Sequence, residues 1–400
     1  MPLIAARLNR IQPSPSSMAG QRARELRAAG RDIIGLTSGE PDFDTPANVC
    51  EAATRAMARS QTKYTDVGGT PELRAAIADK FRRDNQLDYA PNELIVGTGG
   101  KQIIFNAFLC TIEPDDEVIV PAPYWVSYPD IVLLAEGTPV IVPCQPGNGF
   151  KLAPEDLERA ITPRTRWLVL NAPNNPSGAT YSRAELQALA DVLLRHPHVW
   201  VMTDDIYEHI LYDGREFTTI AQVEPALKDR TLTINGVSKA YAMTGWRIGY
   251  GGAPAALVKA MVKLQSQCTS NPSSISQAAA LEALTGPQDF IAERTRVFQS
   301  RRDTVVAALN RIEGVTCHLP EGAFYAYPSC AGLIGRKTPD GKVIETDEDF
   351  VLYLLDAQNL AVLQGGAYGT SPFFRISFAT SMDRLDAGLA RLRAACEALR

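Results

Sequence analysis

The sequence lacks the features that mark membrane-spanning, exported and nucleic-acid-binding proteins. No apolar run approaches the length that crosses a bilayer, and the first residues, MPLIAAR, lack the long apolar stretch of a secretion signal. The net charge is -5, so no excess of basic residues favours nucleic acid or an anionic membrane. We therefore expect a soluble, cytoplasmic protein that binds neither of them.

Cysteine is sparse, and internal repeats are absent. The seven cysteines are scattered, odd in number and never arranged as C-x-x-C, so the sequence does not indicate a disulfide framework. Free, mostly buried thiols in a reducing compartment are the simplest explanation, and we predict no metal site. With hydrophobic residues at 45% and charged residues at 21%, the composition is that of an ordinary globular protein.

The sequence does contain a regular alternation of short apolar runs with amphipathic helical stretches, which predicts an α/β domain. Thr45 and Thr70 are each followed by proline, a pattern typical of a helix N-cap with proline in the first turn. The expected strands are 94–96, 118–120, 139–142, 167–170, 199–203, 231–234 and 247–250.

A chain of 400 residues exceeds what one hydrophobic core usually organises, so we expect two domains. After residues 286–287 the pattern changes to a long charged helix, two further strands and a final helix, which indicates a second, α+β domain. We expect residues 1–45 to join this smaller domain, 46–286 to form the large domain and 287–400 the small one.

A lysine and an arginine eight residues apart are the most informative pair in the chain. Lys239 follows the expected strand 231–234, and burial at the end of a sheet would lower the pKa of its amine and favour Schiff-base chemistry. Arg247 lies between Gly245 and Gly249, where it could approach a phosphate closely. The alternative is an ordinary solvated lysine followed by a glycine-rich turn.

Three more polar motifs follow expected strands, where ligands of open α/β sheets collect. Residues 99–101, Gly-Gly-Lys, open a helix whose free N–H groups suit a phosphate, although they could be a simple cap. The loop 171–178 could likewise be only a connection. Asp204 ends an apolar strand, and a buried carboxylate needs a partner such as a protonated pyridine nitrogen.

Two candidates combine an aromatic or cationic side chain with a buried setting. Trp125 follows the strand 118–120 and could stack on a flat heteroaromatic ring, or it could belong to the core. Arg375 lies in the apolar run 373–378, where its planar guanidinium suits a carboxylate ligand or an internal salt bridge.

Taken together, the chain resembles the class I aminotransferases, the fold type I enzymes that use pyridoxal 5'-phosphate. The resemblance covers nearly the whole chain and implies a large domain with a mostly parallel central sheet that binds the cofactor. The matching motifs, in family order, are Ser-Gly-Glu-Pro-Asp-Phe (38–43), Lys-Tyr-Thr (63–65), Gly-Gly-Lys (99–101), Pro-Tyr-Trp (123–125), Asn-Asn-Pro-Ser-Gly (174–178), Asp-Asp-Ile-Tyr (204–207), Ser-Lys (238–239), Gly-Trp-Arg-Ile-Gly (245–249), Pro-Glu-Gly-Ala-Phe-Tyr (320–325) and Phe-Arg-Ile-Ser (374–377).

The resemblance implies roles for the residues that would surround the cofactor ring. Lys239 would bind the cofactor covalently and then move a proton between the substrate α-carbon and the cofactor. Asp204 would keep the pyridine nitrogen protonated, so that the ring remains an electron sink. Asn175 and Tyr207 would hydrogen-bond the phenolic oxygen, and Trp125 would stack on the ring.

The phosphate and the substrate would be bound by further residues that match the family. Tyr64 resembles a tyrosine that reaches the phosphate from a neighbouring subunit, which implies a homodimer. Arg375 would bind the substrate α-carboxylate, with help from the Gly39 backbone and contacts from Trp125 and Asn175. Ser177 and Asp205 differ from the commoner threonine and glutamate, but neither change removes a catalytic group. The phosphate ligands implied within the subunit are Gly99, Gly100, Lys101, Ser238 and Arg247.

Substrate choice is indicated more weakly. Lys101 and Ser14 match positions that bind a side-chain carboxylate in the bacterial aspartate aminotransferase subgroup; Lys101 could instead serve only the phosphate loop. We therefore expect transamination between L-aspartate or L-glutamate and a 2-oxo acid such as 2-oxoglutarate, by a ping-pong mechanism. The alternatives are a prephenate or broad-specificity aromatic aminotransferase and, from another class, a regulator that binds the cofactor without turnover. No DNA-binding domain precedes the family motifs, which disfavours the regulator.

Overall fold

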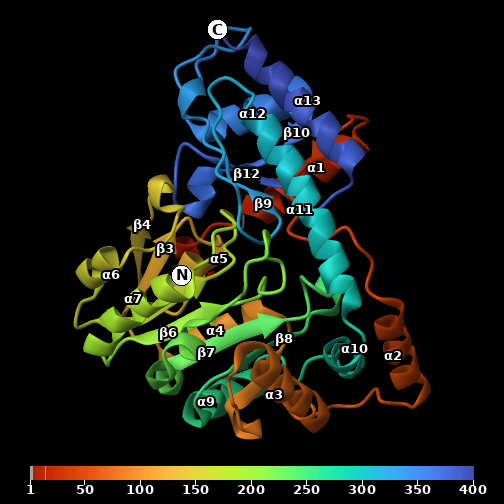
Figure 1. Cartoon of the computed structure of the whole chain (residues 1–400), viewed down its shortest axis with the longest axis vertical. Helices are drawn as coiled ribbons and strands as arrows, with labels where there is room; N and C mark the ends of the chain where they lie inside the picture. Colours follow the sequence, from red (N-terminus) through yellow and green to blue (C-terminus); the bar gives the residue numbers. More distant parts are fainter. Residues whose placement is uncertain (1–2, 14) are drawn as a thin grey trace.

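The computed structural model describes residues 3–13 and 15–400, which form a large sheet-containing part and a smaller part above it (Figure 1). Within these residues the largest sheet has seven strands. Their spatial order is β2 (Leu94–Gly97), β8 (Gly249–Gly252), β7 (Thr231–Gly236), β6 (Trp200–Asp204), β5 (Thr165–Asn171), β3 (Glu117–Ala122) and β4 (Thr138–Pro143). Only β8 runs antiparallel to its neighbours, which confirms the mostly parallel α/β sheet.

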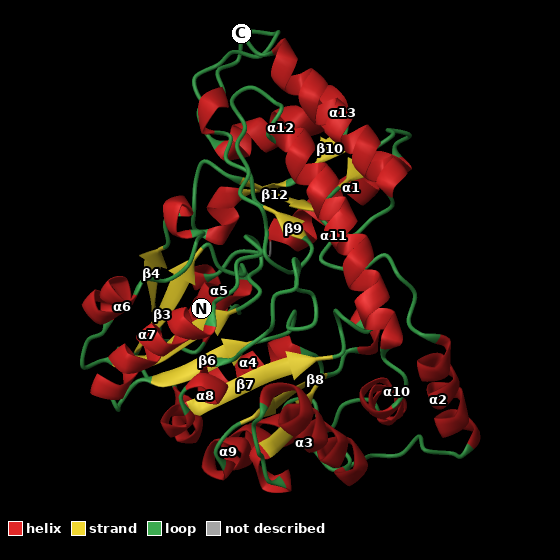
Figure 2. Cartoon of the chain, viewed as in Figure 1, coloured by secondary structure: helices red, strands yellow, loops and turns green. Residues whose placement is uncertain are grey.

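Helices cover both faces of this sheet (Figure 2), so its strands are apolar on both sides. In β5, Trp167 and Val169 face one helical layer, while Leu168 and Leu170 face the other. One layer contains α4 (Gly100–Thr111), α5 (Ser127–Leu134) and α9 (Ala255–Ser266). The opposite layer contains α2 (Ala47–Ala58), α3 (Pro71–Asn85), α6 (Pro154–Ala160), α7 (Arg183–Arg195), α8 (Ile220–Val223) and α10 (Ser274–Thr285).

The smaller part combines short strands with long helices, as the sequence predicts for an α+β unit. A three-stranded antiparallel sheet has the order β11 (Leu363–Gln364), β12 (Phe374–Ser377) and β9 (Tyr325–Ala326). Strand β1 (Ile34–Gly35) pairs in parallel with β10 (Leu360–Ala361), which ties the N-terminal segment to the C-terminal region. The helices are α1 (Pro15–Ala28), α11 (Asp289–Leu309), α12 (Asp347–Gln358) and α13 (Met382–Ala398).

Helix α11 runs from the large part into the small one (Figure 1). Its C-terminal half packs with α13 and β9 in the core of the small part. The proposed domain boundaries at residues 45/46 and 286/287 stay a prediction. Among the described residues, no helix has the length and apolar character needed to span a membrane.

Two local predictions need correction. Thr70 caps α3 as expected, accepting a hydrogen bond from the Leu73 amide at 3.3 Å, but Thr45 caps no helix. Helix α2 starts at Ala47, and the Thr45 hydroxyl donates instead to the Ala242 carbonyl at 2.7 Å. Strand β8 starts at Gly249 rather than Arg247, because Arg247 has a left-handed backbone (φ 56°) that a strand cannot accommodate.

The start of α4 packs directly on β8, and glycine is what permits this approach. A Cβ atom on Gly249 would meet the Gly100 nitrogen and lie 2.5 Å from the Gly99 carbonyl carbon. These are backbone atoms, so they cannot rotate away as a side chain would. The close packing therefore places the free N–H groups of α4 at the edge of the sheet.

We expect Gly249→Ala to destabilise the protein by about 1–3 kcal/mol or more, because α4 must shift to admit a methyl group. The measurement is thermal unfolding of the two proteins. Gly147→Ala is the matched control, since a Cβ atom added there would have no heavy atom within 4 Å and its φ is not positive. Equal melting temperatures for Gly249→Ala and Gly147→Ala would contradict this account of the packing.

Candidate active site

A cavity of about 570 Å³ lies at the carboxyl ends of the parallel strands, between the two parts of the molecule. Parallel strands end at the same edge of a sheet, so polar residues that follow different strands converge there. The predicted residues that line this cavity are Gly39, Gly100, Lys101, Trp125, Asn175, Asp204, Tyr207, Ser238, Lys239, Arg247 and Arg375. The structure therefore brings these predicted residues together from segments far apart in the chain.

Lys239 lies three residues after the end of β7, with its amine on the cavity wall. Its Nζ donates to the Gly39 carbonyl at 2.6 Å and lies 5.6 Å from the centre of the Tyr207 ring. Burial lowers the pKa of this amine to about 8, and the nearby positive charge of Arg375 acts in the same direction. About a tenth of the amine is therefore uncharged at pH 7 and able to act as a nucleophile, far more than for a lysine with the ordinary pKa of 10.5.

Asp204 is the last residue of β6 and faces the same cavity. Burial raises the pKa of its carboxyl, while a hydrogen bond donated by the Tyr128 hydroxyl at 2.6 Å partly opposes that shift. Asn171 holds the strand end, because its Nδ2 donates to the Asp204 carbonyl at 2.8 Å. The carboxylate is thus fixed in a setting of low polarity, where a cationic ligand group would be bound strongly.

Sequence reasoning missed Tyr128, although a signal for it exists. Tyr128 follows Trp125 by three residues at the start of α5, and their rings meet edge to face at 5.2 Å. One short segment therefore places an indole on the cavity wall and a phenol against Asp204. Lys101 also contacts this segment, with its Nζ 4.8 Å from the centre of the Trp125 ring.

The opposite end of the cavity is suited to an anion. Gly100 is the first residue of α4, so the free backbone N–H groups of the first turn of this helix point toward the cavity end. The guanidinium of Arg247 occupies the space beside Gly99 that a side chain would take, with its Cζ 2.9 Å from the point where a Cβ atom would lie. Gly99 is thus beside the cavity and keeps room for Arg247, whose Nη1 donates to the Thr244 carbonyl at 2.8 Å.

Arg375 carries a buried positive charge to the other side of the cavity. Its side chain donates to Asn175 Oδ1 at 2.9 Å and to the Thr37 carbonyl at 2.6 Å. Its described partners are thus an amide oxygen and a carbonyl oxygen rather than a carboxylate, which does not support the alternative of an internal salt bridge. Its buried Nε has no hydrogen-bond partner among the described residues. Tyr325 is a second residue of the site to which the sequence analysis gave no role. Its ring centre lies 4.5 Å from the Arg375 Cζ, and its hydroxyl is hydrogen-bonded to the Tyr207 hydroxyl at 2.8 Å.

Tyr64 does not line this cavity. Tyr64 lies in the loop between α2 and α3 with 91% of its side chain exposed. This position leaves it available to a second subunit, but its role and the homodimer stay predictions. Ser14 lies outside the described residues.

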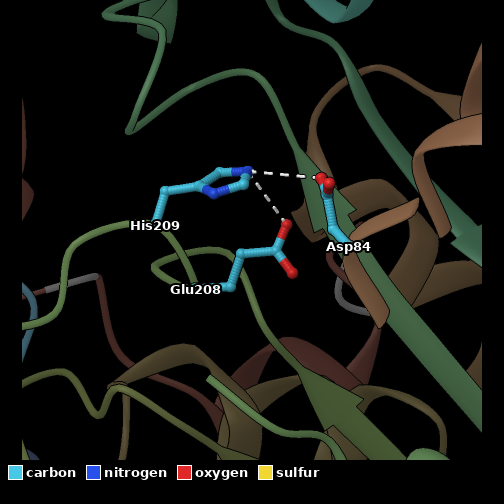
Figure 3. Close-up of side chains that lie close together, drawn as sticks. All are labelled: Asp84, Glu208 and His209. Atoms are coloured by element: carbon cyan, nitrogen blue, oxygen red, sulfur yellow. Dashed lines mark ion pairs between the residues drawn. The ribbon is translucent and has the colours of Figure 1, made fainter. Parts of the chain in front are cut away.

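Asp84, Glu208 and His209 form a cluster of potential metal ligands (Figure 3), and none of the three lines the cavity. His209 Nε2 is 3.2 Å from a Glu208 carboxylate oxygen and 3.9 Å from Asp84. However, the fully buried Lys80 forms an ion pair with Glu208, and Asn85 donates to the other carboxylate oxygen at 2.8 Å. Lys80 already supplies the positive charge that the buried carboxylate needs, so the cluster joins α3 to the turn after β6.

Asp205, next to Asp204, is a buried acid that forms no ion pair with any basic group in the described part of the chain. Its side chain is 1% exposed, and it accepts a hydrogen bond from the Thr203 hydroxyl at 2.5 Å. Burial raises its pKa to about 8, with smaller contributions in the same direction from Glu208 and Asp204. Asp205 therefore keeps its proton at neutral pH in the folded protein.

This raised pKa predicts a pH-dependent loss of stability. The unfolded chain loses the Asp205 proton near the ordinary value of 3.8, whereas the folded chain retains it up to about pH 8. Because the folded state binds more protons in this range, the Asp205 contribution to stability falls as pH rises from about 4 to about 8 and then levels off. Asp205→Asn should remove that contribution while keeping the side-chain shape.

The measurement is the free energy of unfolding of wild type and Asp205→Asn between about pH 5 and about pH 8.5. We expect the difference, wild type minus variant, to decrease steadily with pH. A difference that does not change with pH would show that Asp205 ionises normally in the folded state.

The lysine after a strand end, the buried carboxylate and a helix terminus suited to an anion together indicate a small-molecule enzyme site on an α/β fold. The sequence model of the aminotransferase class I and II family matches residues 31–392. The chain therefore belongs to this family and is an aminotransferase, as the sequence predicts.

Individual relatives agree over the whole chain. It is 57% identical over 395 residues to an aspartate aminotransferase of Rhizobium meliloti (99% of this chain, 96% of the relative). It is 57% identical over 399 residues to an aspartate/prephenate aminotransferase of Cereibacter sphaeroides (100% of both).

Solved structures confirm the predicted fold. An aspartate aminotransferase of Rhizobium meliloti superposes with a TM-score of 0.97 at 56% identity and covers 100% of both chains. The Thermus thermophilus aspartate aminotransferase with maleate gives a TM-score of 0.92 at 42% identity, covering 99% of this chain and 100% of that one.

Proposed function

We propose that the protein transfers an amino group between L-aspartate or L-glutamate and a 2-oxo acid such as 2-oxoglutarate, using pyridoxal 5'-phosphate. The main support for this proposal is that the Lys239 amine, with a pKa of about 8, lies in a cavity that Asp204 and Arg247 also line. The names of the relatives supply the substrate class, since they are aspartate and aspartate/prephenate aminotransferases.

The residues of the cavity fit this cofactor in size and in chemistry. The cavity of about 570 Å³ is large enough for a small heteroaromatic phosphate and an amino acid. Asp204 would face the ring nitrogen, and the N-terminus of α4 with Arg247 would bind the phosphate. The space beside Gly99, already taken by the Arg247 guanidinium, accounts for glycine at this position.

The remaining residues would bind substrate and move its proton. Pyridoxal 5'-phosphate, when bound, supplies an electron sink for the negative charge that develops at the substrate α-carbon. Lys239 would take the proton from the substrate α-carbon and deliver it to the cofactor, which completes the proton movement that transamination requires. Arg375 would bind the α-carboxylate, because its guanidinium is buried, faces the cavity and has no carboxylate partner of its own among the described side chains.

Lys101 is our candidate for the side-chain carboxylate of the substrate. Its Nζ lies above the Trp125 ring at 4.8 Å, and partial burial together with Arg247 lowers its pKa. We also propose that the protein is a cytoplasmic homodimer in which Tyr64 of one subunit completes the site of the other. The high exposure of Tyr64 and the free state of all seven cysteines support this proposal.

An aromatic or prephenate substrate is the second candidate, favoured by the name of the Cereibacter sphaeroides relative. Trp125 and Ile104 line the same cavity and could contact a ring. Aspartate and prephenate each carry a second carboxylate that Lys101 could bind, whereas an aromatic amino acid such as phenylalanine carries none, so changing Lys101 separates these two kinds of substrate.

We expect Lys239→Ala to bind pyridoxal 5'-phosphate without a covalent link and to lose nearly all aspartate aminotransferase activity, because this amine both binds the cofactor and moves the proton. The measurement is kcat of the purified variant. Lys259→Ala, at an exposed lysine on α9, is the control and should keep wild-type activity. Near wild-type kcat in Lys239→Ala would overturn the proposed mechanism.

We expect Lys101→Ala to lower kcat/KM for aspartate by about 30-fold, on the order of 2 kcal/mol, with little change for phenylalanine. The physical reason is that only aspartate presents a second carboxylate that needs a charged partner. Ser14→Ala tests the other matched position in the same assay. Equal losses for both substrates would mean that Lys101 serves the cofactor or the fold instead.

A further inference from the structure

Residues 38–45 form an irregular segment along the edge of the cavity, here called the edge segment. Its inner side is bonded to the chain around Lys239. The Gly39 carbonyl accepts from Lys239 at 2.6 Å, and Glu40 accepts from the Thr244 hydroxyl at 3.1 Å. Thr45 donates to the Ala242 carbonyl at 2.7 Å. The position of this segment therefore decides what lies next to the Lys239 amine.

The outer side of the edge segment is held by one face of α11. Arg294, Phe298 and Arg301 are spaced four and three residues apart, so they lie on the same side of the helix. Arg301 donates two hydrogen bonds to the Asp42 carboxylate, at 2.7 and 2.9 Å. The Phe43 ring meets Phe298 edge to face at 5.3 Å.

Arg294 completes this contact at the end of the edge segment. It donates to the Asp44 carbonyl at 2.7 Å, and its guanidinium lies 5.0 Å from the centre of the Phe43 ring. Three consecutive residues, 42–44, are thus each bound by α11. A small cavity of about 10 Å³, roughly the space of one water, separates Phe43, Phe298 and Arg294 from Lys239. The back of the Lys239 pocket therefore depends on this contact.

The Asp42–Arg301 pair is unfavourable unless it is held in good geometry. Arg301 is 7% exposed, and removing a guanidinium from water is offset only by well-formed hydrogen bonds. A bidentate pair also fixes direction as well as distance, which hydrophobic packing alone does not do. Such a pair three residues from Gly39 is suited to setting the place of the Gly39 backbone.

We propose that Arg301, acting through Asp42, is a positioning residue that holds the edge segment over Lys239 and so places the Gly39 backbone beside the substrate. This inference rests on the proposed function of the cavity, because it assigns Gly39 a place next to the amino-acid substrate. Helix α11 continues into the core of the small part (Figure 1). A shift of the small part would therefore also move Arg301 and, with it, the edge segment.

The chain supplies a matched control in the neighbouring residue. Arg302 is also buried on α11, and it makes an equivalent two-bond pair with Asp213, at 2.7 and 2.9 Å. Neither Arg302 nor Asp213 lines the cavity. Arg301→Met and Arg302→Met each remove a two-bond carboxylate pair from the same helix. Arg302→Met also removes hydrogen bonds to Asp303 and to the Pro320 carbonyl, but only Arg301→Met releases the edge segment.

The first readout is steady-state kinetics of the holoenzyme with aspartate. We expect Arg301→Met to raise KM for aspartate about ten-fold, with a much smaller change in kcat, since substrate placement is lost while Lys239 and Asp204 remain. Arg301→Lys keeps the charge but not the bidentate geometry and should recover only part of the loss. Arg302→Met should keep both constants, even where its thermal stability falls as much.

The second readout uses the cofactor-free protein, so it stands even if aspartate is not the substrate. The rate at which trinitrobenzenesulfonate modifies Lys239, located by peptide mapping, is measured against pH. The midpoint of this rate against pH reports the pKa of the Lys239 amine. We expect it to lie near the pKa of about 8 in wild type and Arg302→Met, and to move toward 10.5 in Arg301→Met as water reaches the amine.

Asp42→Asn keeps the side-chain shape, and it takes the place of Arg301→Met in both assays should that variant not fold. The same rise in KM and the same shift of the Lys239 midpoint are expected from it. KM values and midpoints that match those of Arg302→Met would overturn the proposal. Absence of aminotransferase activity in wild type, with the midpoint shift intact, would instead contradict the proposed function alone.

Discussion

In the proposed mechanism, the chemistry of this protein depends on keeping one lysine amine out of water. Lys239 follows a buried strand, and its pKa falls to about 8 because burial and the Arg375 charge both disfavour the protonated form. The surrounding groups do not fully compensate the positive charge of the protonated amine. Asp204 accepts a hydrogen bond from Tyr128, and the hydrogen-bond partner of the amine is the uncharged Gly39 carbonyl. The fold thus gives up some stability to hold a reactive amine where a ligand can reach it.

The parallel sheet explains how so many charged groups reach one place. Asp204 ends β6, Lys239 follows the neighbouring strand β7, and Gly100 starts the helix after β2. Because these strands end at one edge, a carboxylate, an amine and a helix N-terminus meet without any long loop. The small part then closes the site with Arg375 from β12 and, through α11, with the edge segment.

Most of the site was predictable from the sequence because its residues directly follow apolar strands or stand between glycines. Lys239, Asp204 and Arg247 are recognised in this way, and family resemblance assigns them chemistry. The sequence did not reveal Tyr128 or Arg301 in this way. Tyr128 contacts Asp204 and Arg301 contacts Asp42, and only tertiary packing brings these pairs together from distant parts of the sequence.

The errors in the predicted fold have the same origin. Thr45 has the residue type and the following proline of an N-cap, but its hydroxyl finds a better partner in the Ala242 carbonyl. Predicted strand 247–250 is apolar enough, yet Arg247 turns into a left-handed conformation toward Gly99. The local sequence pattern thus predicted the order of these elements, whereas contacts with residues distant in sequence determine where α2 and β8 begin.

Two lysines line the cavity, and the central claim is that Lys239 rather than Lys101 carries the cofactor. The most direct measurement is borohydride reduction of the protein loaded with pyridoxal 5'-phosphate, followed by digestion and mass spectrometry. The account predicts a pyridoxyl label on Lys239 alone. A label on Lys101, or on no cavity lysine, would contradict it.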